Sequence, residues 1–147
     1  MIMFVKGDIL EARVEAIVNP VNCEGYMGKG LALQVKQLYP KMFNDYSIAC
    51  KEGRLKIGQV HYFQENEKII LNFPTKDKWR AKSKLSYITD GLPVLRDLLK
   101  KLNIKSIAIP PLGCGLGGLK WDEVKQVLLE HLKTVSDTLD IFIYEPI

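Results

Sequence analysis

Residues 110–118 (PPLGCGLGG) combine the residue types that a protein loop needs to bind phosphate groups. Glycine tolerates a positive φ and a close approach to a ligand, and successive backbone N–H groups can then surround an anion. The loop follows the β-branched run 106–110 and precedes an expected helix, whose N-terminus would strengthen the attraction. No Lys-Ser or Lys-Thr pair follows, which excludes a Walker A loop. We expect the loop to bind the diphosphate of a nucleotide; the alternative is a flexible turn without a ligand.

A second glycine-bearing loop, within residues 19–32 (NPVNCEGYMGKGLA), repeats this design. Gly28 and Gly30 lie where a helix is expected to begin. The amides of Asn19 and Asn22 can hydrogen-bond to sugar hydroxyls. The alternative is a helix entry with solvated asparagines.

Asp8 follows an expected strand in the sequence VKGDIL. Its carboxylate could accept a hydrogen bond from an exocyclic amine such as that of adenine. An aspartate that only forms a turn is the alternative.

Residues 76–84 combine cationic side chains with one large aromatic ring. The cations could pair with phosphates, and the indole of Trp79 could stack on a base, which would make this run a lip for a nucleic-acid strand. The alternative is a solvated charged surface. The cationic residues are Lys76, Lys78, Arg80, Lys82 and Lys84.

The composition is that of one soluble globular domain spanning residues 1–147, with 47% hydrophobic and 26% charged residues. No membrane-length apolar run or signal-peptide pattern is found, so we expect a cytoplasmic protein with no membrane partner. The cysteines and histidines lack metal-ligand spacing, so we expect neither a metal site nor a cofactor. Cys23 and Cys114 are expected to pack near the loops rather than to act as nucleophiles. The net charge of +4 is too mild to indicate a partner.

Strand and helix patterns alternate along the chain. Strands are predicted at residues 2–6, 14–19, 59–63, 68–73, 106–110 and 141–144. Apolar residues at helical spacing predict four helices, from about 28 to 38, from 40 to a cap at Gly53, from a cap at Ser83 onward, and from about 121 to 135. Gly91 and Pro93 predict a kink or a break in the third helix near Leu92.

This order predicts an α/β fold, a three-layer α/β/α sandwich with a mixed central sheet. In such sheets, ligands bind beyond the carboxyl ends of the strands. The loops at residues 7–10, 19–30 and 110–119 all leave expected strand ends. We therefore expect them to form the walls of one cleft.

Together and in this order, the three loop motifs resemble the macrodomain family, an ADP-ribose-binding α/β/α module, over the whole chain. The resemblance implies that Asp8 and Ile9 contact adenine and that Tyr144 packs against its ring. It also implies that residues 113–118 hold the diphosphate and that Asn22 with residues 27–31 surrounds the distal ribose. The full set of ADP-ribose-binding residues that it implies is Gly7, Asp8, Ile9, Asn19, Cys23, Met27, Gly28, Gly30, Leu31, Ala32, Thr75, Pro111, Leu112, Gly113, Cys114, Gly115, Leu116, Gly117, Gly118 and Tyr144.

Residues 72–88 (NFPTKDKWRAKSKLSYI) are similar to one branch of that family. The branch includes the terminal ADP-ribose protein glycohydrolase and the DarG-type antitoxins, which remove ADP-ribose that DarT toxins place on DNA bases. The resemblance implies that Lys76, after Thr75, is catalytic, with Asn22 as a second catalytic candidate. The protein glycohydrolase has an aspartate at the position of Gly117. DarG-type proteins have a glycine there, as this chain does. This difference favours the DNA-directed reading.

Lys76 could take part in the reaction in two ways. An ordinary lysine is charged at neutral pH, so it becomes a nucleophile only if its surroundings remove the proton. Alternatively, Lys76 stays charged and stabilises the transition state or the leaving group. Both roles remain open, with a direct action at the distal ribose expected in either case.

The leading hypothesis is a metal-independent ADP-ribosyl glycohydrolase of the antitoxin type. It would remove ADP-ribose from a nucleic-acid base, in single-stranded DNA, with contacts to the strand from Lys78, Trp79, Arg80 and Lys82. A cognate ADP-ribosyltransferase toxin would be its partner. DarG-type proteins carry a further C-terminal domain, so the chain is expected to be a fragment or a stand-alone relative. The alternatives are hydrolysis of ADP-ribose esters on protein or of the anomeric phosphate of ADP-ribose, and a non-catalytic ADP-ribose reader.

Overall fold

The computed structural model describes residues 1–147 and contains one six-stranded sheet with the strand order β1-β6-β5-β2-β4-β3. Five neighbouring strands run parallel, and β3 pairs antiparallel with β4 at one edge. The sheet is therefore mixed, as expected. The strands are β1 (Ile2–Val5), β2 (Ala16–Asn22), β3 (His61–Glu65), β4 (Lys68–Lys76), β5 (Ser106–Ile109) and β6 (Asp140–Tyr144).

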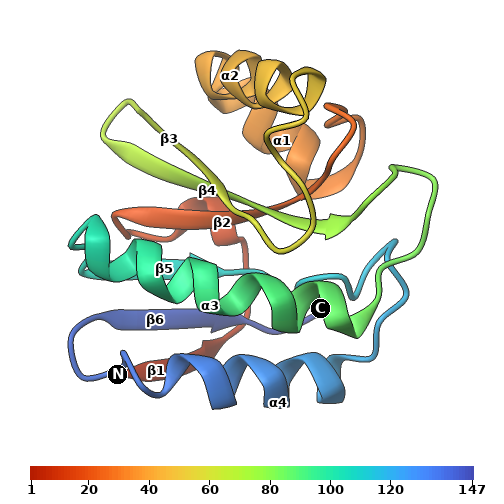
Figure 1. Ribbon diagram of the computed structural model, residues 1–147. Helices are drawn as coiled ribbons and strands as arrows, with labels where there is room; N and C mark the ends of the chain where they lie inside the picture. Colours follow the sequence, from red (N-terminus) through yellow and green to blue (C-terminus); the bar gives the residue numbers. More distant parts are fainter.

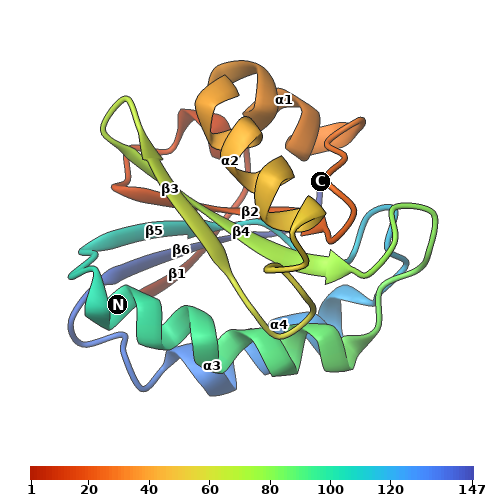
Figure 2. The ribbon, with the colours of Figure 1, turned by 45° about the horizontal axis from the view of Figure 1, so that its top comes forward.

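Two pairs of helices cover the two faces of the sheet, as Figures 1 and 2 show. Helices α1 (Gly30–Leu38) and α2 (Pro40–Lys51) pack on one face, and α3 (Leu85–Lys101) and α4 (Trp121–Leu132) on the other. Each face has its own buried apolar cluster. The predicted α/β/α sandwich is confirmed. None of the helices is long and apolar enough to cross a lipid bilayer.

The central strands are apolar on both sides because both faces are covered. Ile17 of β2 and Ile70 of β4 belong to the cluster under α1 and α2, while their neighbours Val18 and Leu71 belong to the cluster under α3 and α4. This alternation follows from the period of two along a strand. It accounts for the nearly continuous apolar runs that made these strands recognisable.

The carboxyl ends of the five parallel strands lie along one edge of the sheet, which we call the carboxyl edge: Val5, Asn22, Lys76, Ile109 and Tyr144 end β1, β2, β4, β5 and β6. From the neighbouring strands β2 and β5, the chain continues to helices on opposite faces. Ligands of α/β sheets bind at such a switch point. The fold thus provides the position for a site between the loops that follow β2 and β5.

Several boundaries differ from the prediction. The strand expected at 14–19 is β2, shifted to Ala16–Asn22, and β4 continues to Lys76. Thr75 and Lys76, which lie beyond the predicted strand end at residue 73, are therefore part of β4. A 3-10 turn, η1 (Ile9–Glu11), was not expected, and α4 ends at Leu132 instead of 135. Gly53 follows α2 with a φ of +70°, as predicted for a glycine cap.

Helix α3 runs without the break expected near Leu92. Its buried face, which includes Leu92 and Leu95, offsets the helical hydrogen bond that Pro93 cannot make. Gly91 has a packing role, because a Cβ there would lie 2.5 Å from Cζ of Phe73. The expected cap is also wrong: Lys84 precedes the helix and Ser83 caps nothing.

Candidate functional site

Lys76 lies at the carboxyl edge beside the end of β2. The parallel register of β2 and β4 pairs Asn22 with Lys76, after an irregularity between Val21 and Asn22. Irregularities of this kind re-aim side chains and are frequent near active sites. Thr75 is buried, Lys76 is half-buried, and none of the ion pairs in the structure uses the Lys76 ammonium. The two residues expected to be catalytic, Lys76 and Asn22, are therefore neighbours.

The side chain of Asn22 organises the loop that follows β2. Its Oδ1 accepts hydrogen bonds from the backbone N–H groups of Glu24 (3.0 Å), Gly25 (3.2 Å) and Tyr26 (3.3 Å), and its Nδ2 donates to the carbonyl of Tyr26 at 2.8 Å. From α2, the buried Tyr46 hydroxyl donates to the Asn22 carbonyl at 2.7 Å. The second N–H of the Asn22 amide has no acceptor in the protein, and the residue is 9% exposed. The residue is a loop organiser first.

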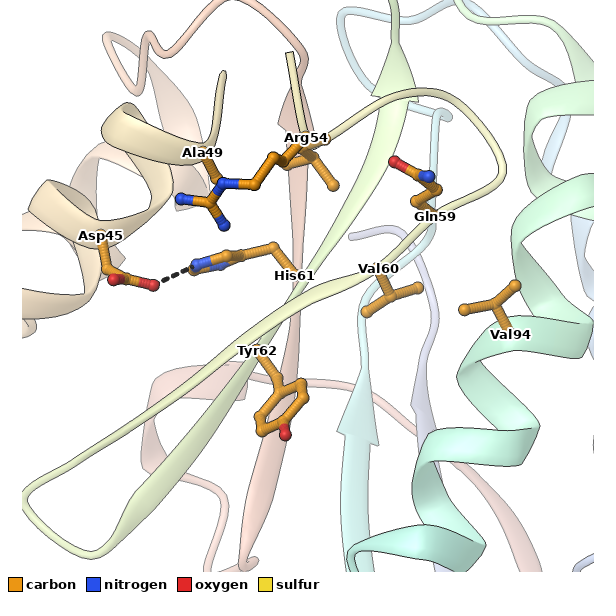
Figure 3. A pocket seen from close by; sticks show the side chains of 9 residues that line it. Asp45, Ala49, Arg54, Gln59, Val60, His61, Tyr62 and Val94 are labelled. Carbon is orange, nitrogen blue, oxygen red and sulfur yellow. Dashed lines mark hydrogen bonds and ion pairs between the residues drawn. The ribbon is translucent and has the colours of Figure 1, made fainter. Parts of the chain in front are cut away.

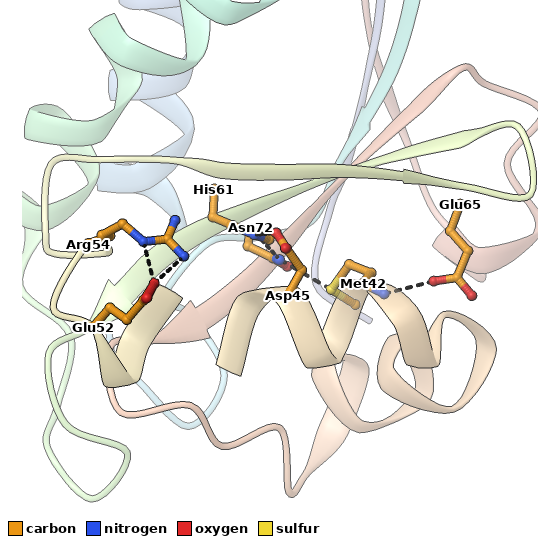
Figure 4. A network of polar contacts seen from close by, with 7 residues as sticks. All are labelled: Met42, Asp45, Glu52, Arg54, His61, Glu65 and Asn72. Carbon is orange, nitrogen blue, oxygen red and sulfur yellow. Dashed lines mark hydrogen bonds and ion pairs between the residues drawn. The ribbon is translucent and has the colours of Figure 1, made fainter. Parts of the chain in front are cut away.

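Asn19 lies below this loop, in a buried polar chain. It has no exposed surface, and its Nδ2 donates to Oδ1 of Asn72 at 3.0 Å. Nδ2 of Asn72 is hydrogen-bonded to Nδ1 of His61 at 2.9 Å, and Nε2 of His61 is hydrogen-bonded to the carboxylate of Asp45 at 2.7 Å (Figure 4).

The contact between Asn19 and a sugar must therefore be corrected. A fully buried amide offers no atom to a ligand, and the same holds for Leu112, which is also completely buried. Met27 is nearly so. These three side chains support the loops of the carboxyl edge from beneath.

The glycine-rich loop after β5 presents free backbone donors. Gly113 and Gly118 have φ values of +73° and +82°. The loop bonds to itself through the N–H groups of Cys114 (to Pro111 O, 3.1 Å), Gly118 (to Gly115 O, 3.2 Å) and Leu119 (to Gly113 O, 2.9 Å). The N–H groups between them, from Gly115 to Gly117, have no acceptor in the protein. Three consecutive free donors form the kind of nest that binds an anion.

Gly117 is in close contact with Ser83, which lies between Lys82 and Lys84 of the cationic run. The N–H of Ser83 donates to the Gly117 carbonyl at 3.0 Å. A Cβ on Gly117 would lie 2.2 Å from Oγ of Ser83 and 2.5 Å from the Gly113 carbonyl oxygen. The Ser83 hydroxyl itself is buried without a hydrogen-bond partner. No sequence signal linked these positions, because they meet only in the folded chain.

The N-terminus of α1 is a second set of unused donors. Its capping residue Lys29 makes no side-chain hydrogen bond to the first turn. Gly28 and Gly30 are exposed, and Leu31 and Ala32 are half-buried. An uncapped helix N-terminus attracts anions and accepting oxygens.

Asp8 and Tyr144 lie together at the other end of the carboxyl edge. Oδ1 of Asp8 accepts the N–H of Leu10 at 2.9 Å and caps η1, so Asp8 does form a turn. The other carboxylate oxygen has no hydrogen-bond partner in the protein. Burial raises the pKa of the Tyr144 phenol, and the nearby carboxylates of Asp8 and Glu11 raise it further. Ile9 is buried at this turn and Gly7 is exposed.

The loops after β2 and β4 are held together by three contacts that sequence reasoning missed. The N–H of Cys23 donates to the Asp77 carbonyl at 3.1 Å, and Oε1 of Glu24 accepts the N–H of Trp79 at 2.9 Å. The rings of Tyr26 and Trp79 meet edge to face, 6.3 Å apart. Arg80 lies over the indole, 4.5 Å from its centroid.

The thiols are poor nucleophiles. Burial is the main cause that raises the pKa of Cys23 to about 12, and burial raises the pKa of Cys114 to about 11. A thiol with such a pKa carries almost no thiolate at neutral pH. This supports the expected packing role of both cysteines.

A separate hollow of about 480 Å³ lies between α2, β3 and α3 (Figure 3). Its walls include Asp45, Arg54, His61 and Tyr62, and none of the predicted ligand-binding residues. The hollow is therefore separate from the donors and loops of the carboxyl edge.

Comparison with known proteins gives consistent results. A model of the Macro domain family matches residues 18–128. The DNA ADP-ribosyl glycohydrolase of Mycobacterium tuberculosis is 49% identical over 99% of this chain, and that of Thermus aquaticus is 43% identical over 100%. The chain spans 42% of the length of each of these relatives.

Solved structures agree. The macrodomain of Mycobacterium tuberculosis DarG superposes with a TM-score of 0.97 at 48% identity. The match covers 100% of this chain and 99% of the DarG macrodomain chain. The Thermosipho africanus DarTG structure, in complex with ADP-ribose, gives a TM-score of 0.92 at 33% identity and covers 99% of this chain and 42% of its own.

Proposed function

The chain belongs to the macrodomain family, and on that premise we propose that it is a glycohydrolase that removes ADP-ribose from a base of single-stranded DNA. The observation that carries the proposal is the position of Lys76, which ends β4 beside Asn22 with an ammonium free of ion-pair partners. The names of the relatives, DNA ADP-ribosyl glycohydrolases of 49% and 43% identity, support DNA as the substrate.

ADP-ribose would lie along the carboxyl edge. Adenine fits beside Asp8, Ile9 and Tyr144, where one carboxylate oxygen of Asp8 is free to accept from the exocyclic amine. The diphosphate fits over the free N–H groups of residues 115–117 and the uncapped N-terminus of α1. The distal ribose then reaches the end of β2, next to Lys76.

In the reaction, water adds its oxygen to the anomeric carbon of the distal ribose, and the bond from that carbon to the base nitrogen breaks. The base leaves with the proton that the water loses. A charged Lys76 would stabilise negative charge on the departing base as it develops. The remaining amide N–H of Asn22 would orient the ribose. The thiols of Cys23 and Cys114, which are half-buried and have raised pKa values, have no part in the step.

Gly117 and the basic lip favour DNA over a protein ester. The fit between Gly117 and Ser83 leaves no room for a carboxylate in the loop. Lys78, Arg80 and Lys82 are exposed next to Trp79, as a phosphodiester strand requires.

The proposed partner is an ADP-ribosyltransferase that creates the substrate. A relative from Thermosipho africanus, 33% identical, is named a DNA ADP-ribosyl transferase-DNA ADP-ribosyl glycohydrolase fusion protein. The two DNA ADP-ribosyl glycohydrolases compared above come from bacteria, so we assign the activity to the cytoplasm, where bacterial DNA lies.

The test is the release of ADP-ribose from a single-stranded oligonucleotide that carries one ADP-ribosylated base. We expect the wild-type chain to release free ADP-ribose and restore the unmodified strand, as followed by mass spectrometry. An intact substrate, together with ADP-ribose binding by calorimetry, would make the protein a reader and overturn the proposal. Cleavage of only a protein ester or of the anomeric phosphate would reassign the substrate.

A further inference from the structure

Two exposed aromatic rings form a corner beside the proposed reaction centre. Tyr26, in the loop after β2, is 57% exposed, and Trp79, in the loop after β4, is 41% exposed. Their planes meet at 74° with centroids 6.3 Å apart. We call this pair the aromatic corner. Large rings held together at the surface indicate a binding surface.

The aromatic corner is fixed before any ligand binds. The side chain of Asn22 holds Tyr26 from both sides, since it accepts the Tyr26 N–H at 3.3 Å and donates to the Tyr26 carbonyl at 2.8 Å. The Glu24 carboxylate accepts the N–H of Trp79 at 2.9 Å. Both rings therefore start from a fixed backbone, which lowers the entropy cost of binding.

The two rings are not equivalent. Arg80 lies over the face of Trp79, 4.5 Å from the ring centroid, and Tyr26 approaches the same ring at a steep angle. Tyr26 is the more exposed ring. A flat ligand would therefore stack on Tyr26 and meet Trp79 at its edge.

The aromatic corner adjoins the glycosidic bond that is to be broken. Asn22 pairs with Lys76 in the sheet, and the loops continue side by side through the bond from Cys23 to Asp77 at 3.1 Å. The corner is the next feature along these two loops. A part of the substrate that lies in the aromatic corner must therefore be close to the modified base along the substrate.

The charges around the aromatic corner indicate what that part of the substrate is. Four exposed cations lie in residues 76–84: Lys78, Arg80, Lys82 and Lys84. The nearby carboxylate of Glu24 accepts the backbone N–H of Trp79. Flat rings combined with cations suit a nucleic-acid strand, whose bases stack while its phosphates pair. An acidic peptide would use the cations but not the rings.

Resting on the proposed function, we propose that Tyr26 stacks on the unmodified base next to the ADP-ribosylated base, with Trp79 at its edge and Arg80 free to pair with the phosphate between the two. Glu24 is a positioning residue for Trp79. In a duplex both faces of each base are already stacked, so the aromatic corner requires a single strand. It also makes the substrate longer than one nucleotide.

The experiment compares two substrates, an ADP-ribosylated mononucleoside and an ADP-ribosylated single-stranded oligonucleotide with the same modified base. The measured quantity is the kcat/KM for the oligonucleotide divided by that for the mononucleoside. We expect Tyr26→Ala to lower this ratio about ten-fold, the effect of losing one base–aromatic stack, and Tyr26→Phe to retain it. Tyr62→Ala is the matched control, since Tyr62 is a 41% exposed tyrosine on β3 and not on the loops of the carboxyl edge.

A second measurement is independent of turnover. A labelled, unmodified single-stranded oligonucleotide is titrated with each variant and followed by fluorescence anisotropy. Tyr26→Ala should bind about ten-fold more weakly than wild type, and Tyr62→Ala should bind equally well. Equal ratios and equal binding for Tyr26→Ala and wild type would overturn the aromatic corner, as would tighter binding of an acidic peptide than of the oligonucleotide. Failure of wild type to cleave either substrate would instead contradict the proposed function, and the titration would still decide on Tyr26.

Discussion

Lys76 is the residue on which the proposed reaction rests, because it ends β4 beside Asn22 and has no ion-pair partner. We predict that Lys76→Ala lowers kcat about 100-fold or more, the usual effect of removing one group that stabilises charge in a transition state. Calorimetry should show that this variant still binds ADP-ribose. Lys78→Ala is the matched control, with an unchanged kcat at saturating substrate but weaker binding of the strand. Full turnover by Lys76→Ala would remove Lys76 from the mechanism.

Gly117 is the residue of the glycine-rich loop that tolerates a side chain least. We predict that Gly117→Ala weakens ADP-ribose binding about ten-fold, because overpacking by one methyl group costs about 1–3 kcal/mol or displaces the loop. Ser83→Gly should not restore binding, since the Gly113 carbonyl would remain 2.5 Å from the new Cβ. Gly115→Ala is the control in the same loop, because nothing lies within 4 Å of its Cβ position. Equal affinities of the two alanine variants would refute this packing argument.

At the residue scale, the sequence was informative where one motif contains its own chemistry. The free donors of residues 115–117 and the turn at Asp8 follow from local residue types. Tyr26 and Ser83 were missed because each makes its contact with a loop that is distant in the sequence. Asn19 was misassigned because an amide on a strand covered on both faces is buried, which no local pattern indicates.

At the element scale, α2 holds the end of β2 through one buried hydroxyl. The Tyr46 hydroxyl donates to the Asn22 carbonyl at 2.7 Å, and Tyr46 has no exposed surface. We predict that Tyr46→Phe lowers the free energy of unfolding by about 1–3 kcal/mol, the cost of a buried acceptor left without its donor. Urea denaturation measures this change. Tyr62→Phe, at an exposed ring, should leave stability unchanged; equal stabilities of all three proteins would mean that the hydroxyl does not support the loop.

The elements themselves were largely predictable, and the exceptions have physical causes. Gly91 suggested a broken helix because its packing role is not visible in the sequence. The glycine leaves room for the ring of Phe73, a tertiary contact. Pro93 stays inside α3 because burial of Leu92 and Leu95 outweighs the lost hydrogen bond. β4 extends to Lys76 because it pairs with β2 up to Asn22, a partner that a single strand's pattern cannot reveal.

At the scale of the whole molecule, the alternation of strands and helices predicted the sandwich, and the parallel order follows from the crossing helices. The sheet order β1-β6-β5-β2-β4-β3 was not predicted, because it depends on which strands meet across the core. That order brings the ends of β5, β2 and β4 together, and with them the glycine-rich loop, Asn22 and Lys76.

The stability of the whole chain should depend on pH through Cys23. Its pKa is raised from 9.0 to about 12, first by burial and then by Asp77, Cys50 and Glu24. Above pH 9 the Cys23 thiol ionises more readily in the unfolded chain than in the folded chain, which favours unfolding. The contribution of Cys23 to the free energy of unfolding is therefore complete below pH 9 and is lost as the pH rises toward 12. We predict that Cys23→Ala flattens the fall of Tm between pH 9 and 11, measured by circular dichroism under reducing conditions. Parallel curves for the two proteins would contradict the shift.

The most direct test of the central claim is the ratio of two rates, measured with one preparation of the wild-type chain. One substrate is single-stranded DNA with an ADP-ribosylated base, and the other is a peptide with ADP-ribose esterified to a glutamate. Lys76 beside Asn22, the exposed cations of the lip and the filled space at Gly117 together predict a higher kcat/KM for DNA. A higher kcat/KM for the ester, with DNA left intact, would contradict the account.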